Sequence, residues 1–124
     1  MLVGDAAAQV KPTSGGGLFP GLLCATHCGT TAEKAFQTQH FNARHLQHYH
    51  KKWTTDIGRE LSFGMRFRTV FIRFTDAQFN KYIEKINRKK TLDVINIYGD
   101  IDYPSRLLFP LIKAMPSLLS LAPT

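Results

Sequence analysis

Apolar residues recur at helical spacing along most of this chain. Over residues 16–36 they form one face of a predicted helix, which consists of Leu18, Leu22, Ala25 and Ala32. Over residues 42–74 two apolar stripes lie on opposite sides, so a second, longer helix is expected to pack between neighbours. Its main stripe consists of Phe63, Phe67, Val70 and Phe74.

Start and stop signals predict the elements that follow. Thr75 and Gln78 form a capping box, so a helix is expected over residues 76–88. Residues 91–97 predict a short helix, with a strand as the alternative because their side chains also alternate. A further helix is expected to begin at Pro104, to bend or break at Pro110, and to be followed by a last turn after Pro116.

The first eighteen residues do not follow the helical pattern. A short apolar strand end over residues 1–4 leads into a Gly-Asp turn and a loop over residues 5–14, and three glycines then open the first helix. Unpaired N–H groups at a helix start carry partial positive charge. Glycine lets the backbone touch a ligand because it has no Cβ. This opening predicts a binding corner for a nucleotide-like ligand.

The opening is similar to a motif of a known family. Its residues are Gly4-Asp5-Ala6-Ala7, then Pro12, then Gly15-Gly16-Gly17-Leu18. They resemble the last flavin-contacting motif of FAD-dependent oxidoreductases, and most closely that of archaeal geranylgeranyl reductases. In that family the Asp bonds the ribityl chain, and the helix start lies at the pyrimidine edge of the isoalloxazine. The resemblance implies cofactor-binding roles for Gly4, Asp5, Ala6, Gly15, Gly16, Gly17 and Leu18.

Enzymes of that type begin with a βαβ unit that carries G-x-G-x-x-G, and this sequence has none. The resemblance therefore implies a C-terminal fragment of an α/β, Rossmann-like FAD-binding oxidoreductase. The fragment itself is expected to be mainly α, a strand end followed by about five helices. Residues 1–38 would supply the last strand, flavin-contacting loop and helix of the FAD-binding domain, and residues 39–124 a helical C-terminal region. The missing N-terminal FAD-binding portion would be a partner.

The resemblance also implies a function, the reduction of carbon–carbon double bonds in isoprenoid (geranylgeranyl) chains during membrane lipid biosynthesis. FAD would be the cofactor, NAD(P)H or ferredoxin the electron donor, and an isoprenoid lipid the substrate. The fragment alone is expected to bind FAD weakly and to be inactive, and its sequence identifies no catalytic residue. Two alternatives stay open: a flavin monooxygenase or quinone-linked dehydrogenase of the same group, and a non-enzymatic, basic lipid-binding helical module.

A net charge of +7 favours an anionic partner. Four basic residues recur every seven positions and form a ribbon of Lys52, Arg59, Arg66 and Arg73. A solvated helix edge is the favoured interpretation, and a surface for lipid phosphates is the alternative. No targeting sequence or long apolar run is visible, so a cytoplasmic location is expected, with peripheral contact to a membrane as an extension. No nucleic-acid-binding motif is present, so no nucleic-acid partner is expected.

Two further pairs of polar side chains lie close together in the sequence. His45 and His48 lie three residues apart, but no third ligand is placed to complete a zinc site, so no metal is expected. Asp100 and Asp102 are expected to cap the helix that begins at Pro104.

Overall fold

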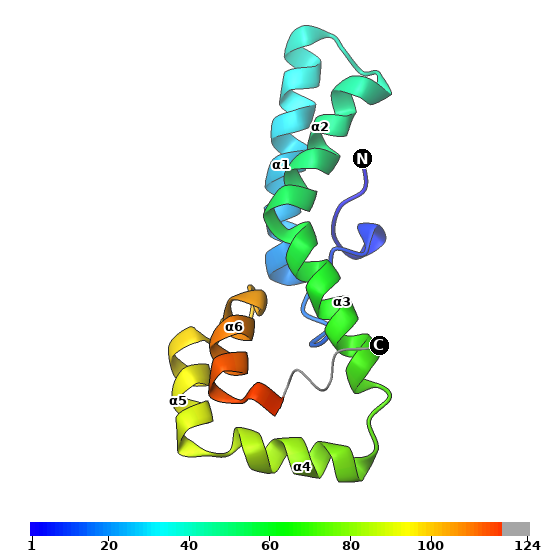
Figure 1. The fold of residues 1–124 in the computed structure, drawn as a ribbon. Coiled ribbons are helices and arrows are strands. Elements are labelled where there is room, and N and C mark those ends of the chain that lie inside the picture. Colours follow the sequence, from blue (N-terminus) through cyan, green and yellow to red (C-terminus); the bar gives the residue numbers. More distant parts are fainter. Residues whose placement is uncertain (118–124) are drawn as a thin grey trace. The chain divides into compact units, whose positions relative to one another are not determined.

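The computed structural model describes residues 1–117, and these residues form helices joined by short loops (Figure 1). They divide into two compact units, one over Met1–Gly64 and a second that begins at Met65. The sequence-based boundary between residues 38 and 39 concerns the domains of a larger enzyme and stays a prediction. The mainly α character of the chain is confirmed.

The first unit is built on a helical hairpin. A 3-10 helix, η1 (Gly4–Ala7), precedes α1 (Leu18–Thr38), and α2 (Ala43–Trp53) returns along α1 in the opposite direction (Figure 1). Asn42 caps α2, since its side-chain oxygen accepts a hydrogen bond from the His45 N–H at 2.9 Å. The predicted helix over residues 16–36 is thus confirmed, with a start two residues later.

The buried face of α1 is not the predicted one. The predicted residues include Leu18 and Leu22, whose side chains are 79% and 61% exposed. The buried side chains are instead mostly small ones, and they are Pro20, Cys24, Thr31 and Ala35. Small side chains let α2 approach closely, so packing selects their face and leaves the larger apolar residues outside.

The predicted helix over residues 42–74 is observed as three consecutive segments. After α2 comes one π-helical segment, η2 (Thr54–Gly58), and then α3 (Arg59–Phe71). The basic ribbon does not form one straight stripe. The π segment separates Lys52 from Arg59, which breaks the constant 100° step between them, and Arg73 lies beyond the end of α3. These basic side chains are exposed, in agreement with a solvated helix edge.

The predicted strand end at residues 1–4 is wrong. Val3 has the extended backbone of a strand, with φ −137° and ψ 151°, but η1 begins at the next residue. No strand occurs anywhere in residues 1–117. A strand is stable only when its N–H and C=O groups pair with a neighbouring extended segment, and the described residues provide none.

The second unit contains α4 (Asp76–Ile86), α5 (Lys89–Tyr98) and α6 (Ser105–Ala114). The capping box of Thr75 and Gln78 is confirmed, and residues 91–97 are helical rather than extended. Pro110 does not break α6, because the helix continues to Ala114 around it. The last turn predicted after Pro116 lies largely outside the described residues.

Aromatic rings join the end of α3 to α4 within this second unit. Consecutive ring centroids lie between 4.2 and 5.8 Å apart, a spacing at which stacked and edge-on pairs attract. The rings belong to Phe67, Phe71, Phe74, Phe79 and Tyr82. The predicted phenylalanine stripe thus packs at its C-terminal end against the next helix.

Candidate functional site

The loop between η1 and α1 folds back on itself. The Gln9 N–H donates to the Gly4 carbonyl at 3.0 Å, which closes the first turn. Further along, the Lys11 N–H donates to the Gly16 carbonyl at 3.0 Å, and the Gly15 N–H donates to the Lys11 carbonyl at 2.9 Å. These bonds return the chain to the start of α1. We call residues 4–18 the glycine corner.

The Asp5 carboxylate lies against the glycines at the helix start. A Cβ added to Gly17 would stand 2.7 Å from Asp5 Oδ1, a distance that side-chain atoms do not tolerate. A side chain at position 17 would therefore displace this carboxylate from the helix start. The carboxylate also sits where the partial positive charge of α1 stabilises an anion.

Donor groups at this helix start are open. Gly17 is the N-cap of α1, and no side chain caps it. Within residues 1–117 the N–H groups of Gly17 and Leu18 have no hydrogen-bond acceptor. Gly15 has φ +73°, which a side chain would strain, and open space surrounds the position of its missing Cβ. The corner thus presents one carboxylate acceptor beside two unpaired donors.

The predicted site residues are only partly gathered into this arrangement. Asp5 and Gly17 touch, whereas Gly4 faces α1, where a Cβ on Gly21 would lie 3.6 Å from the Gly4 Cα. Ala6 is exposed within η1, and the Leu18 side chain points into solvent while its backbone starts the helix. That these residues contact a flavin stays a prediction.

Two residues that the sequence did not single out hold the corner in place. Gln9 is fully buried; its Oε1 accepts from the Gly4 N–H at 2.8 Å, and its Nε2 donates to Tyr49 Oη at 2.8 Å. The Tyr49 hydroxyl in turn donates to the Leu2 carbonyl at 2.6 Å. Burial raises the pKa of Tyr49, and the bond from Gln9 opposes that rise. A lone Gln in a polar loop gives no periodic signal from which this role could be predicted.

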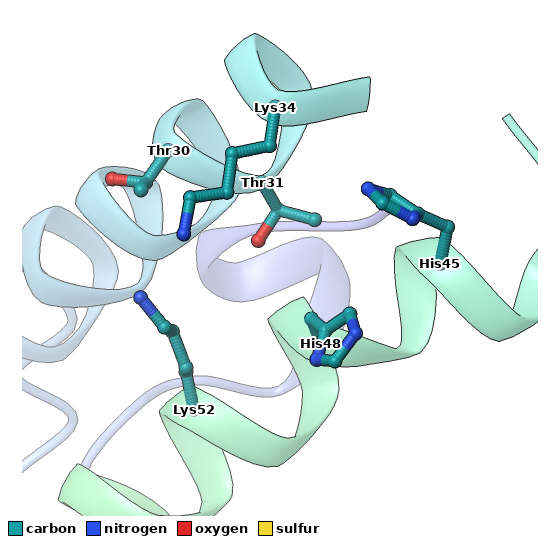
Figure 2. A pocket seen from close by; sticks show the side chains of 6 residues that line it. All are labelled: Thr30, Thr31, Lys34, His45, His48 and Lys52. Atoms are coloured by element: carbon teal, nitrogen blue, oxygen red, sulfur yellow. The ribbon is translucent and has the colours of Figure 1, made fainter. Parts of the chain in front are cut away.

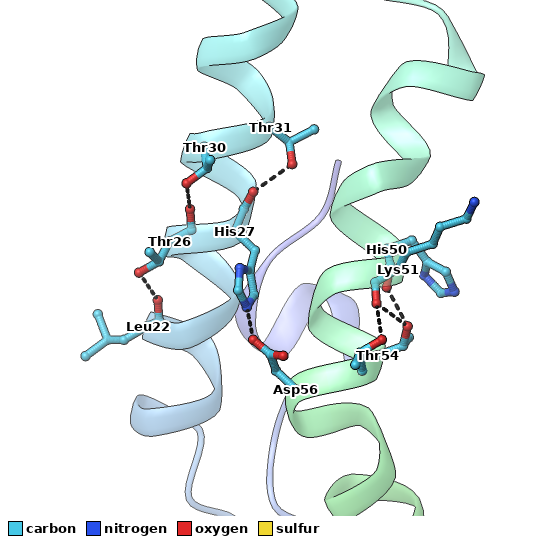
Figure 3. A network of polar contacts seen from close by, with 10 residues as sticks. Leu22, Thr26, His27, Thr30, Thr31, His50, Lys51, Thr54 and Asp56 are labelled. Carbon is cyan, nitrogen blue, oxygen red and sulfur yellow. Dashed lines mark hydrogen bonds and ion pairs between the residues drawn. The ribbon is translucent and has the colours of Figure 1, made fainter.

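A histidine–carboxylate contact joins α1 to the π segment. His27 Nε2 lies 2.6 Å from Asp56 Oδ2, and Figure 3 shows the two side chains meeting between the helices. Cys24 lies on α1 one turn before His27, and burial together with the Asp56 charge raises the pKa of its thiol. Asp56 belongs to η2, so the π segment supplies the carboxylate of this contact with α1.

The comparison with known proteins supports the family that the motif of the opening residues resembles. An uncharacterized protein of Methanocaldococcus jannaschii is 34% identical over 115 residues, which is 93% of this chain. Digeranylgeranylglycerophospholipid reductase 2 of Methanopyrus kandleri is 28% identical over 122 residues, or 98% of this chain. Digeranylgeranylglycerophospholipid reductase 1 of Methanosphaera stadtmanae is 34% identical over 102 residues, or 78% of this chain. The chain belongs to the geranylgeranyl reductase family.

This geranylgeranyl reductase family member covers only part of its relatives. It spans 22–30% of the length of each of eight curated relatives that it matches. No protein-family model and no solved structure matches it. In the part of the family member that the structure describes, no helix is both long and apolar enough to cross a membrane.

Proposed function

We propose that this chain is part of an FAD-dependent reductase that saturates carbon–carbon double bonds of isoprenoid lipid chains. One observation carries the proposal: the Asp5 carboxylate and the glycine start of α1 meet in one corner. The relatives named digeranylgeranylglycerophospholipid reductases support the substrate class. The chain would contribute the glycine corner and helices that contact the lipid.

The chemistry of the glycine corner fits a flavin. In the described residues the Asp5 carboxylate has no hydrogen-bond donor of its own, so it is available to accept from a ribityl hydroxyl. The N–H groups of Gly17 and Leu18 are available to donate to the electron-rich pyrimidine edge. When bound, FAD supplies the hydride-transfer chemistry, with electrons proposed to come from NAD(P)H or ferredoxin. The protein contributes position and electric field.

A groove between α5 and α6 is the proposed contact for the lipid chain. It has a volume of about 550 Å³, and its apolar lining consists of Val94, Tyr98, Phe109, Pro110 and Ala114. Lys90 and Lys113 also line it, so an anionic amphiphile matches it in both character and charge. We propose that this groove forms part of one wall of the isoprenoid site.

Titration of the 124-residue chain with FAD tests the glycine corner. Asp5→Ala removes the acceptor and Gly17→Val displaces the carboxylate, so each is expected to weaken FAD binding about tenfold, the loss typical of one charged hydrogen bond. Asp93→Ala removes an exposed carboxylate from α5 and should leave the affinity unchanged. Equal FAD affinity in all four proteins would contradict the proposed corner.

The reductase activity is tested in the context of a complete enzyme. This chain replaces the matching segment of the Methanopyrus kandleri reductase, and the products formed from a geranylgeranyl lipid are identified with and without oxygen. Retained saturation of double bonds supports the proposal. Oxygen-dependent hydroxylation would indicate the monooxygenase alternative instead. The chain alone is expected to turn over no NAD(P)H.

A further inference from the structure

A basic pocket lies between α1 and α2, away from the glycine corner. It has a volume of about 160 Å³ and is lined by Thr30, Thr31, Lys34, His45, His48 and Lys52. Figure 2 shows the Lys34 and Lys52 ammonium groups directed toward each other, and both imidazoles on the α2 side. All the lining residues belong to the first unit.

The charges in this pocket have one sign. No carboxylate lines it, and within residues 1–117 neither Lys34 nor Lys52 has an ion-pair partner. Two ammonium groups that face each other repel, and an anion between them turns this repulsion into attraction. The pocket is therefore complementary to an anion.

The hydroxyl groups of the pocket do not compete for this role. Thr30 Oγ1 donates to the Thr26 carbonyl at 2.9 Å, and Thr31 Oγ1 donates to the His27 carbonyl at 2.8 Å (Figure 3). Both hydroxyl protons are thus already used inside α1. The donors left for a ligand are the two ammonium groups and the imidazole N–H groups of His45 and His48.

The size and donor set of the pocket distinguish among ligands. A water molecule occupies about 30 Å³ of liquid, so about 160 Å³ holds a tetrahedral oxyanion with a few waters. Two lysines together with two imidazoles match a doubly charged phosphate better than a singly charged carboxylate. A metal ion does not fit, because protonated lysines repel it and residues 1–117 contain no group of three suitable ligands.

We propose that this pocket binds a phosphate group, either as free phosphate or as the phosphomonoester head group of a lipid. The ammonium groups of Lys34 and Lys52 hold the phosphate oxygens from opposite helices, and His45 and His48 donate from α2. The inference does not rest on the proposed function, because it uses no residue of the glycine corner or of the groove between α5 and α6.

The test uses the 124-residue chain and two phosphate sources. Binding of inorganic phosphate is measured by calorimetry. Binding to phosphatidylcholine vesicles with phosphatidic acid is compared with binding to phosphatidylcholine alone. Lys34→Gln with Lys52→Gln removes both pocket charges. Lys51→Gln with Lys81→Gln is the control, since it removes the same net charge from exposed side chains outside the pocket. Far-UV circular dichroism verifies that each variant keeps its helices.

The pocket variant is expected to lose about tenfold or more in phosphate affinity, since each charged hydrogen bond contributes about 1.5–3 kcal/mol. The control is expected to stay within about twofold, because neither Lys51 nor Lys81 lines the pocket and a charge that does not contact the ligand acts weakly through water. If the chain binds inorganic phosphate and the pocket variant loses this binding, free phosphate is a sufficient ligand. If the chain binds only the vesicles with phosphatidic acid and the pocket variant loses this binding, the ligand is a lipid head group. Equal losses in the two variants, or no binding of either probe, would overturn the proposal.

Discussion

At the scale of single residues, the glycine corner depends on a buried amide. Gln9 is 0% exposed, and both ends of its side chain are bonded, one to Gly4 and the other to Tyr49. A buried polar group that loses its partner costs much more than the bond itself contributes. The Tyr49 hydroxyl therefore determines whether the loop keeps its shape.

Tyr49→Phe tests this dependence. The substitution removes the acceptor for Gln9 Nε2 and the donor to the Leu2 carbonyl, so the free energy of unfolding is expected to fall by about 1–3 kcal/mol. Urea unfolding followed by circular dichroism measures the change. Tyr98→Phe, at a half-exposed tyrosine of α5, is the matched control and is expected to change stability by less than about 0.5 kcal/mol.

The same residues show how far the sequence could predict the site. Asp5 and the three glycines lie within one short motif, so their meeting follows from local turn geometry. Gln9 and Tyr49 lie 40 positions apart, and only the packing of α2 brings them together. A contact of that separation leaves no trace in local spacing, so it could not be predicted from a single sequence.

At the scale of elements, short-range signals predicted the start of α4 but not the π segment that divides the helix predicted over residues 42–74. The Thr75 capping box uses groups within one turn, whereas the π segment contacts α1 through Asp56 and His27, which lie 29 positions apart. In the turn before α6 the sequence-based expectation was only partly right. The acidic residue Asp100 does not cap α6; its Oδ1 accepts from the N–H groups of Asp102 and Tyr103, at 2.9 and 3.0 Å.

This turn predicts a pH dependence. The two backbone N–H groups, with Arg106 adding a smaller effect, lower the pKa of Asp100 from its usual value of 3.8. A lowered folded pKa means that the ionised carboxylate stabilises the turn above about pH 3.8, and that this stability is lost as the pH falls through the folded pKa. Asp100→Asn should lose this part of the acid dependence of unfolding, while Asp93→Asn should retain it. Identical acid unfolding curves for Asp100→Asn and the unaltered chain would contradict the assignment.

At the scale of the whole molecule, large apolar side chains remain exposed on α1. Leu22 and Phe36 are 61% and 67% exposed, and Leu18 is 79% exposed. The periodicity correctly predicted a helix here, but two faces carried apolar residues, and only the position of α2 decided which face is buried. The exposed face agrees with a chain that spans less than a third of its relatives' length.

Exposed apolar surface of this kind binds hydrophobic dyes. The 124-residue chain is expected to enhance the fluorescence of anilinonaphthalene sulfonate, and Leu22→Ser with Phe36→Ser is expected to reduce that enhancement. Stability should change by less than about 0.5 kcal/mol for each exposed position, as it should for the control Gln37→Ser. Unchanged dye fluorescence in the double variant would show that this face is covered in solution.

The two thiols of α1 can be used to measure how often α1 and α2 separate. Cys24 is 0% exposed and its pKa is raised, whereas Cys28, one turn later, is half-buried. Iodoacetamide attacks the thiolate, so Cys28 should be alkylated first, and Cys24 only in molecules whose two helices have come apart. The ratio of the two alkylation rates then reports how often the hairpin opens, without any added label.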